Sequence, residues 1–376
     1  MKNILFALVM IPLSVFTACN SDDDDDSFAS KSDVDESGEK KINEGVFDAL
    51  YTTGWFKKDK NVRPIYYKDN EVIELNKLDA DHNTRASYIS IENEDIHILG
   101  ESTTPSKLLY WHNGNPIHLP HETLSSLIIP VGISVKDGNV HIVAKELNTE
   151  LYGDVFYWKN GVRQRISAAD KSAKANDLLV TDDDVYIVGS EDNRSGGFSF
   201  DPDEPETAAY WKNGEKHLLT AISKSSEASQ IREDSKDIYI SVLERDSGND
   251  IYTIYKNDVP VKSYPSNEYI EDFAVKNGKI HAIAAYYVTN SDGTGLDTKL
   301  KYYVDDIAQS FSSKMTQSIS LILHDDDVYV SGVYFEGDNP KSVLLRNGVP
   351  TNFEFEGEIE NVTVNDMILK TKPRTS

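Results

Sequence analysis

A short pattern recurs seven times along the 376-residue chain, and this repetition constrains the fold more than any single residue does. Each copy has two β-favouring residues, a third residue that is often Lys, and then a pair drawn from Asn, Asp and Gly. Such pairs tolerate the positive φ of a two-residue hairpin turn, so each copy predicts a β-hairpin. The copies begin 42 to 53 residues apart, at Tyr66, Tyr110, Tyr157, Tyr210, Ile254, Tyr302 and Leu344.

A second hairpin precedes each copy. We name its two strands a and b, and the strands on either side of the repeated turn c and d. Residues alternate with period 2 in these segments, which is typical of strands and not of helices. Strand b carries an aliphatic residue followed by His or Tyr, at Leu50-Tyr51, Ile96-His97, Val140-His141, Val185-Tyr186, Ile238-Tyr239, Ile280-His281 and Val328-Tyr329.

The two ends of the repeat predict a closed ring. Strands b, c and d begin at the N-terminal side, where no strand a precedes Leu50, and a seventh strand a lies near the C-terminal end, at 361–365. We expect this last strand to complete the first sheet, which makes residues 44–376 an all-β, seven-bladed β-propeller of four-stranded blades. Residues 367–369 could begin another strand b, so six or eight blades stay open.

The N-terminal segment predicts an exported lipoprotein. Lys2 precedes a largely apolar stretch of 13 residues, Ile4 to Phe16, which is too short to span a membrane as a helix but suits a signal peptide. The residues before Cys19 resemble the lipobox of bacterial lipoproteins, in which the cysteine is lipidated. This resemblance implies that 1–18 is a signal peptide and that Cys19 carries a palmitate-type anchor in the membrane. An ordinary signal peptide is the alternative.

Five aspartates follow the cysteine, Asp22 to Asp26, and we interpret 19–43 as an acidic, disordered tether. An acidic run at this place resembles the surface-export signal of Bacteroidota lipoproteins, which implies display on the outer membrane. A solvated spacer is the alternative interpretation. The Tyr-Trp-Lys-Asn-Gly units at 157–161 and 210–214 are similar to those of uncharacterised propeller-like surface lipoproteins of Bacteroidota, and the similarity covers about 44–376. It implies architecture and location and transfers no activity.

Composition excludes several classes of partner and site. The single cysteine excludes an intramolecular disulfide and any multi-cysteine metal centre. A formal net charge of −25 argues against nucleic acid, which needs clustered Lys and Arg.

Unequal loops indicate where a ligand would bind. The a–b and c–d turns are tight, whereas the connections b–c and d–a vary in length and meet on the opposite face, where functional residues tend to lie. We therefore expect a ligand site that includes Arg194, Phe198, Phe200, Asp201, Asp292 and Asp297. Insertions without function are the alternative. Oxygen ligands at Asn290, Asp292, Thr294 and Asp297 would also suit Ca²⁺, against a plain solvated acidic loop.

Aromatic residues at repeated positions are expected to pack between blades and not to bind ligands. We assign Trp111, Trp158 and Trp211 to the core, with sugar stacking as the alternative, and His97, His141 and His281 to packing as well.

Three functions fit these features, and the sequence names neither a ligand nor an oligomeric state. The first is a surface-exposed binding module for a glycan, a peptide or an outer-membrane protein. The second is a propeller glycoside hydrolase or polysaccharide lyase, and the third is a structural subunit of an uptake complex. Strand a positions are mostly aliphatic, so we expect no cluster of catalytic residues at the central channel and favour a non-enzyme. No cofactor is indicated apart from the Ca²⁺ already considered.

Overall fold

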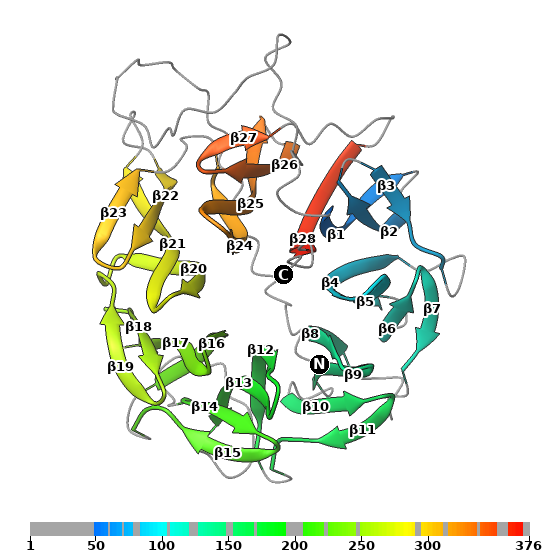
Figure 1. Cartoon of the computed structure of the whole chain (residues 1–376), viewed down its shortest axis with the longest axis horizontal. Coiled ribbons are helices and arrows are strands. Elements are labelled where there is room, and N and C mark those ends of the chain that lie inside the picture. Colours follow the sequence, from blue (N-terminus) through cyan, green and yellow to red (C-terminus); the bar gives the residue numbers. More distant parts are fainter. Residues whose placement is uncertain are drawn as a thin grey trace, which may run out of the picture.

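The chain forms a ring of seven four-stranded antiparallel sheets, a seven-bladed β-propeller without helices among its described residues (Figure 1). The computed structural model describes residues 49–58, 61–69, 71–77, 83–103, 106–119, 127–147, 153–168, 171–192, 206–221, 225–245, 249–289, 295–310, 315–336, 339–351 and 360–370. No helix in these ranges is long and apolar enough to cross a membrane.

Each blade runs from an inner strand a to an outer strand d. Blades 1 to 3 contain β1 (Ala49–Lys58), β2 (Asn61–Lys68), β3 (Glu71–Glu74), β4 (Thr84–Glu92), β5 (Asp95–Thr103), β6 (Ser106–His112), β7 (Asn115–His118), β8 (Leu127–Lys136), β9 (Asn139–Leu147), β10 (Gly153–Lys159) and β11 (Val162–Arg165). Blades 4 and 5 contain β12 (Ala173–Val180), β13 (Val185–Asp192), β14 (Glu206–Lys212), β15 (Glu215–Leu218), β16 (Ser225–Asp234), β17 (Asp237–Arg245), β18 (Ile251–Lys256) and β19 (Val259–Ser263). Blades 6 and 7 contain β20 (Glu268–Lys276), β21 (Lys279–Thr289), β22 (Leu296–Val304), β23 (Ile307–Ser310), β24 (Gln317–His324), β25 (Asp327–Glu336), β26 (Asn339–Arg346) and β27 (Val349–Thr351), and β28 (Glu360–Lys370) returns to blade 1.

The last strand closes the ring, as the sequence predicts. The order of the first sheet is β28-β1-β2-β3, and β28 pairs with β1 from Ala49↔Lys370 to Lys57↔Glu360. Residues 367–369 continue β28 and do not begin a further strand b, which fixes the number of blades at seven. In Figure 1 the red β28 lies beside the blue β1 at the inner edge of the first blade.

The Asn or Asp of each repeated turn holds strand b as well as making the turn. Asn160 has a φ of +50°, its backbone N–H donates to the Val140 carbonyl, and its side-chain Oδ1 accepts the Val140 N–H at 2.8 Å. The same side-chain contact to a strand-b N–H recurs in all seven blades, from Asp69, Asn113, Asn160, Asn213, Asn257, Asp305 and Asn347. Asn or Asp therefore recurs at this position for two reasons: its side chain accepts a hydrogen bond from strand b, and its backbone tolerates a positive φ.

The repeated tryptophans lie in the core, which confirms that interpretation. Trp111, Trp158 and Trp211 are among the largest fully buried side chains of the described residues. Trp158 of blade 3 packs in one cluster with Leu99 and Tyr110 of blade 2. Each tryptophan thus fills the space between its own blade and the preceding one, where truncation to Ala typically costs about 3–5 kcal/mol.

The three strand-b histidines also have packing roles. Nδ1 of His97 and Nδ1 of His141 each lie 2.6 Å from the hydroxyl oxygen of a strand-c tyrosine, Tyr110 and Tyr157 respectively. His281 makes the equivalent contact with Tyr302. Burial lowers the pKa of each of these histidines, so the neutral ring is favoured inside the blade.

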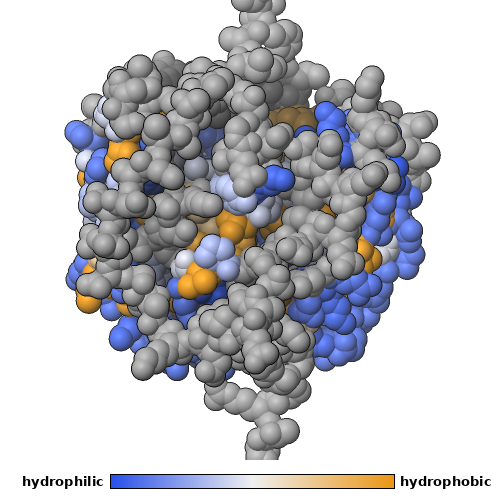
Figure 2. All heavy atoms as spheres, turned by 90° about the horizontal axis from the view of Figure 1, so that it is seen from above, coloured by the Kyte–Doolittle hydropathy of each residue, from blue (hydrophilic) through white to orange (hydrophobic). Residues whose placement is uncertain are grey.

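The outer rim exposes both polar and apolar residues. The outer strands β7, β11, β15 and β19 expose most of their residues, and Ile117, Val162 and Val259 are among the exposed apolar ones. In the side view of Figure 2, described hydrophobic residues form small patches among hydrophilic ones. Exposed polar residues on outer strands discourage edge-to-edge association of the sheets.

Removing the side chain of Asn160 should destabilise the propeller. Asn160→Ala loses the acceptor for Val140 N–H and leaves a residue at positive φ that tolerates it poorly, at a cost of about 2 kcal/mol. Asn160→Asp keeps the acceptor, as Asp69 and Asp305 do in other blades, and should cost less than about 1 kcal/mol. Urea unfolding of both variants measures the difference, and equal losses would contradict the role of the side-chain acceptor.

Candidate functional site

Every inner strand contains a β-bulge at the same place. One extra residue interrupts the pairing of each strand a with strand b: Ser87, Val131, Asn176, Ser229, Glu271, Ile319 and Asn365. A bulge frees backbone N–H groups from the sheet and redirects side chains. The positions around it therefore decide what faces the axis of the ring.

Three aspartates directly after a bulge join neighbouring blades. Each carboxylate accepts the N–H of the next residue in its own strand and the N–H of the equivalent residue in the following blade. The acceptors and donors are Asp177 with Leu178 and Ile231, Asp272 with Phe273 and Leu321, and Asp366 with Met367 and Ile89, at 2.7–3.0 Å. We call these three residues the axial carboxylates, and they satisfy buried N–H groups that the bulges release.

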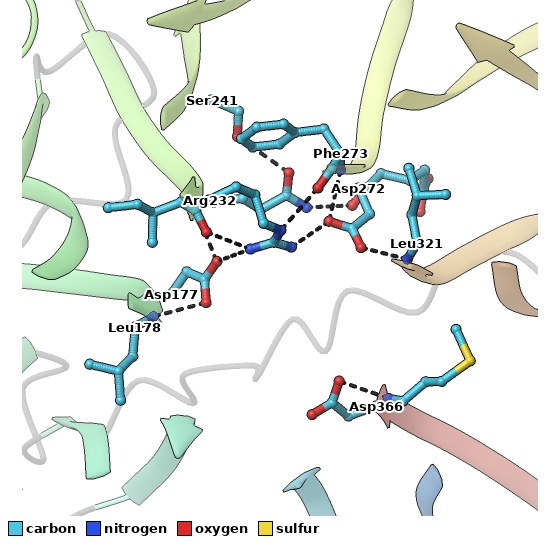
Figure 3. A network of polar contacts seen from close by, with 12 residues as sticks. Asp177, Leu178, Arg232, Ser241, Asp272, Phe273, Leu321 and Asp366 are labelled. Carbon is cyan, nitrogen blue, oxygen red and sulfur yellow. Dashed lines mark hydrogen bonds and ion pairs between the residues drawn. The ribbon is translucent and has the colours of Figure 1, made fainter. Parts of the chain in front are cut away.

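Arg232 links two of the axial carboxylates (Figure 3). Its guanidinium nitrogens lie 2.7 Å from Asp177 Oδ2 and 2.6 Å from Asp272 Oδ1. The Arg232 side chain is 31% exposed although strands surround it, because it faces the axis. Burial raises the pKa of Asp272, and the charge of Arg232 opposes this rise.

Asp366 lies across the axis from this pair (Figure 3). Burial raises its pKa to about 7, the charges of Asp177 and Asp272 add to the rise, and its two backbone hydrogen bonds oppose it. All three axial carboxylates are occupied by backbone donors, so we assign them a structural role.

A carboxyl group suited to proton transfer lies next to them. Glu271 is the extra residue of the bulge in β20, and burial together with the charge of Asp272 raises its pKa to about 7. A group that titrates near neutral pH can act as a general acid or base. Burial raises the pKa of Tyr252 to about 12, the charge of Arg245 opposes the rise, and the charges of Glu227 and Glu271 add to it.

Ion pairs gather at the strand ends on the face of the b–c and d–a connections, which we call the loop face. Lys174 Nζ lies 2.6 Å from Glu206 Oε1, and Arg245 Nη2 lies 3.0 Å from Glu227 Oε2. Burial lowers the pKa of nearby Lys145. Because the two glutamates are already paired with cations, they do not form a metal site, and the group is suited to hydrogen bonding with a neutral or weakly charged ligand.

Three tyrosines continue this group across blades 5 and 6. The ring of Tyr269 lies edge-on to Tyr252, at 6.3 Å between centroids, and to Tyr287, at 5.8 Å. Tyr269 is 36% exposed and Tyr287 is 54% exposed, and no other Phe, Trp or Tyr whose burial the structure describes is this exposed. We call Arg245, Glu227 and these three tyrosines the loop-face cluster.

Most residues expected from the sequence to bind a ligand lie outside the described part of the chain: Cys19, Arg194, Phe198, Phe200, Asp201 and Asp292. Asp297 is described; it is partly buried in β22 and pairs with Val288. The expected Ca²⁺ ligands Asn290 and Thr294 also lie outside the described ranges. Tyr287, on the strand that precedes 290–294, is the nearest member of the loop-face cluster to these expected residues in sequence.

Sequence reasoning missed the polar residues of strand a. We expected mostly aliphatic side chains there, but Asp177, Arg232, Asp272 and Asp366 project toward the axis (Figure 3). The bulge explains the error, because one inserted residue reverses which side chains face inward. The available signal was an Asp at the same place in three repeats, each followed by an apolar residue.

Comparisons with known proteins support the fold. No protein-family model and no curated protein sequence matches the chain. A puromycin-hydrolysing peptidase of Mycobacterium tuberculosis is similar, with 13% identity and a TM-score of 0.52 over 85% of this chain and 53% of the peptidase. An oligogalacturonate lyase in complex with manganese has 7% identity and a TM-score of 0.50 over 80% of this chain and 85% of the lyase. The chain thus spans about half the length of the peptidase. At these identities the likeness shows the propeller fold alone.

Glu271 should make the stability depend on pH. Its pKa of about 7 in the folded protein exceeds the value of about 4.3 in the unfolded chain. Glu271 therefore contributes fully to the free energy of unfolding below about pH 4.3, and this contribution is lost as the pH rises through 7. Glu271→Gln removes this loss. When the pH is raised from 5 to 7.5, the free energy of unfolding of the variant minus that of wild type should rise by about 1–3 kcal/mol.

Urea unfolding at both pH values measures this change. Glu215→Gln, on the exposed outer strand β15, controls for loss of a surface carboxylate. The same gain in both variants would contradict the role of burial at Glu271.

Proposed function

We propose that the chain is a surface-displayed lipoprotein whose propeller binds a glycan through the loop-face cluster. The observation that carries this proposal is the exposed pair Tyr269 and Tyr287. Apolar ring faces are costly to expose to water, and an exposed aromatic group beside polar side chains is a common mark of a binding site.

The surroundings of the tyrosine pair favour a sugar as the ligand. Sugars present apolar C–H faces, which stack on aromatic rings, and hydroxyl groups, which need hydrogen-bond donors and acceptors. Arg245 and Glu227 supply both kinds of group next to Tyr252. The net charge of −25 disfavours a highly charged polyanion, because long-range repulsion would oppose its approach.

Removing either exposed ring should weaken glycan binding. We expect Tyr269→Ala and Tyr287→Ala each to weaken the affinity of a glycan selected on an array by about tenfold, because each ring contributes roughly 1 kcal/mol or more of contact energy. Titration calorimetry measures the affinity of the full-length chain.

Ile307→Ala is the matched control, since Ile307 is exposed in the same blade but follows the c–d turn on the opposite face. Unchanged affinity in both tyrosine variants would overturn the proposed site.

The proposed anchor rests on Cys19 and the aspartates that follow it. Cys19→Ser removes the thiol that would carry the lipid, so the variant should lose palmitate labelling and partition into the aqueous phase of a detergent extraction. Brief protease treatment of intact wild-type cells should also degrade the protein, because it is exposed on the surface. Labelled Cys19→Ser protein would contradict lipidation at this residue.

An acid–base enzyme is the second candidate, and Glu271 favours it. A carboxyl group with a pKa near 7 could transfer protons to or from a bound polysaccharide. Depolymerisation of the bound glycan that Glu271→Gln abolishes, with binding retained, would favour this candidate over the binding module.

A further inference from the structure

The face opposite the loop face, which carries the tight a–b and c–d turns, contains a repeated group of three side chains. An Asp at the start of strand b pairs with a cation at the end of strand c, and this cation lies over the ring of the strand-b aromatic residue. In blade 4, Asp184 Oδ2 lies 2.8 Å from Lys212 Nζ, which is 5.3 Å from the centroid of Tyr186. Blades 5 and 7 repeat the arrangement with Asp237, Tyr239 and Lys256, and with Asp327, Tyr329 and Arg346.

Blade 2 departs from this rule at two of the three positions. Asp95 keeps the place of the acid, but His97 replaces the tyrosine and His112 replaces the cation. His97 and His112 are directly paired across β5 and β6, and their rings stack with centroids 4.7 Å apart. Blade 2 therefore brings two imidazoles and a carboxylate together where blades 4, 5 and 7 have an ion pair.

The ligating atoms of this trio are close enough to share one ion. His112 Nε2 lies 3.5 Å from Asp95 Oδ1, and one ligand atom from each of the three residues lies within 4.8 Å of the others. Ligand atoms on a tetrahedral zinc ion, each at about 2.0–2.1 Å from the metal, are about 3.3 Å apart. The 3.5 Å between His112 Nε2 and Asp95 Oδ1 is already close to this spacing, and a ligand atom of His97 lies within 4.8 Å of both.

Neighbouring residues hold the trio in the required orientation. The Tyr110 hydroxyl engages His97 Nδ1 at 2.6 Å, which leaves Nε2 of this buried ring for the group. Asn113 Nδ2 donates to Asp95 Oδ1 at 2.8 Å and fixes the carboxylate. Such outer hydrogen bonds orient the ligands of metal sites.

We propose that Asp95, His97 and His112 bind a divalent first-row transition metal such as Zn²⁺. Two imidazole nitrogens with one carboxylate suit Zn²⁺, Ni²⁺ or Cu²⁺ and not Ca²⁺ or Mg²⁺, which take oxygen ligands. The side chains of Asp95 and His112 are 56% and 43% exposed, so an ion can enter from solvent and keep a water molecule at its fourth position. This site is independent of the loop-face cluster, because it lies on the opposite face.

The equivalent residues of other blades indicate a substitution that should remove one metal ligand and keep the fold. His112→Lys places in blade 2 the lysine that blades 3, 4 and 5 carry as Lys159, Lys212 and Lys256, so it should preserve the fold and the pairing with Asp95. The full-length chain, purified in detergent without an affinity tag, is titrated with Zn²⁺ by calorimetry. Wild type should bind one ion, and His112→Lys should bind at least about tenfold more weakly.

Two further variants make the result specific. His118→Lys changes an exposed histidine of the same blade outside the trio and should bind Zn²⁺ as wild type does. Asp95→Asn removes one ligand and should also weaken binding, while Co²⁺ bound to wild type should give the intense visible absorption of a tetrahedral site. Zn²⁺ binding that is absent from wild type, unchanged in His112→Lys, or equally weakened in His118→Lys would overturn the proposal.

Discussion

The pairing of β28 with β1 is the constraint on which the rest of the structure depends. The first blade is a four-stranded sheet like the other six only because it obtains its strand a from the far end of the described chain. Once the ring is closed, each blade can bury one face against each neighbour, and the repeated tryptophans fill these interfaces. The axial carboxylates add hydrogen bonds between inner strands, so closure is reinforced at the axis as well as in the core.

The two faces of the disc differ in how much their residues vary from blade to blade. On the turn face, one Asn or Asp per blade makes the same contacts seven times, which leaves little freedom for variation. On the loop face, the ends of the strands carry different residues in each blade, and the exposed tyrosines and the ion pairs Lys174–Glu206 and Arg245–Glu227 lie there. Blade 2 shows that the turn face can also diverge, where His97 and His112 stand in place of the usual tyrosine and lysine.

The sequence predicts the architecture well because the signal is local and repeated. Turn pairs such as Asn160-Gly161 and the period-2 strands establish the hairpins, and counting strands at both ends predicts the closure that β28 makes. The bulges could not be predicted in the same way, because one inserted residue leaves the alternation intact on each side of it. The orientation of Asp177, Arg232, Asp272 and Glu271 depends on those bulges, so the polar residues near the axis were missed. Tyr269 and Tyr287 were also missed, since their exposure and mutual contact come from two different strands of a folded blade.

The position of β28 has a consequence for how the molecule is made. The first three strands of blade 1 leave the ribosome more than 280 residues before the strand that completes their sheet. Contacts between such distant segments form late and slow folding, because a long segment of chain must be ordered before they are gained. The propeller therefore cannot close before β28 has been synthesised.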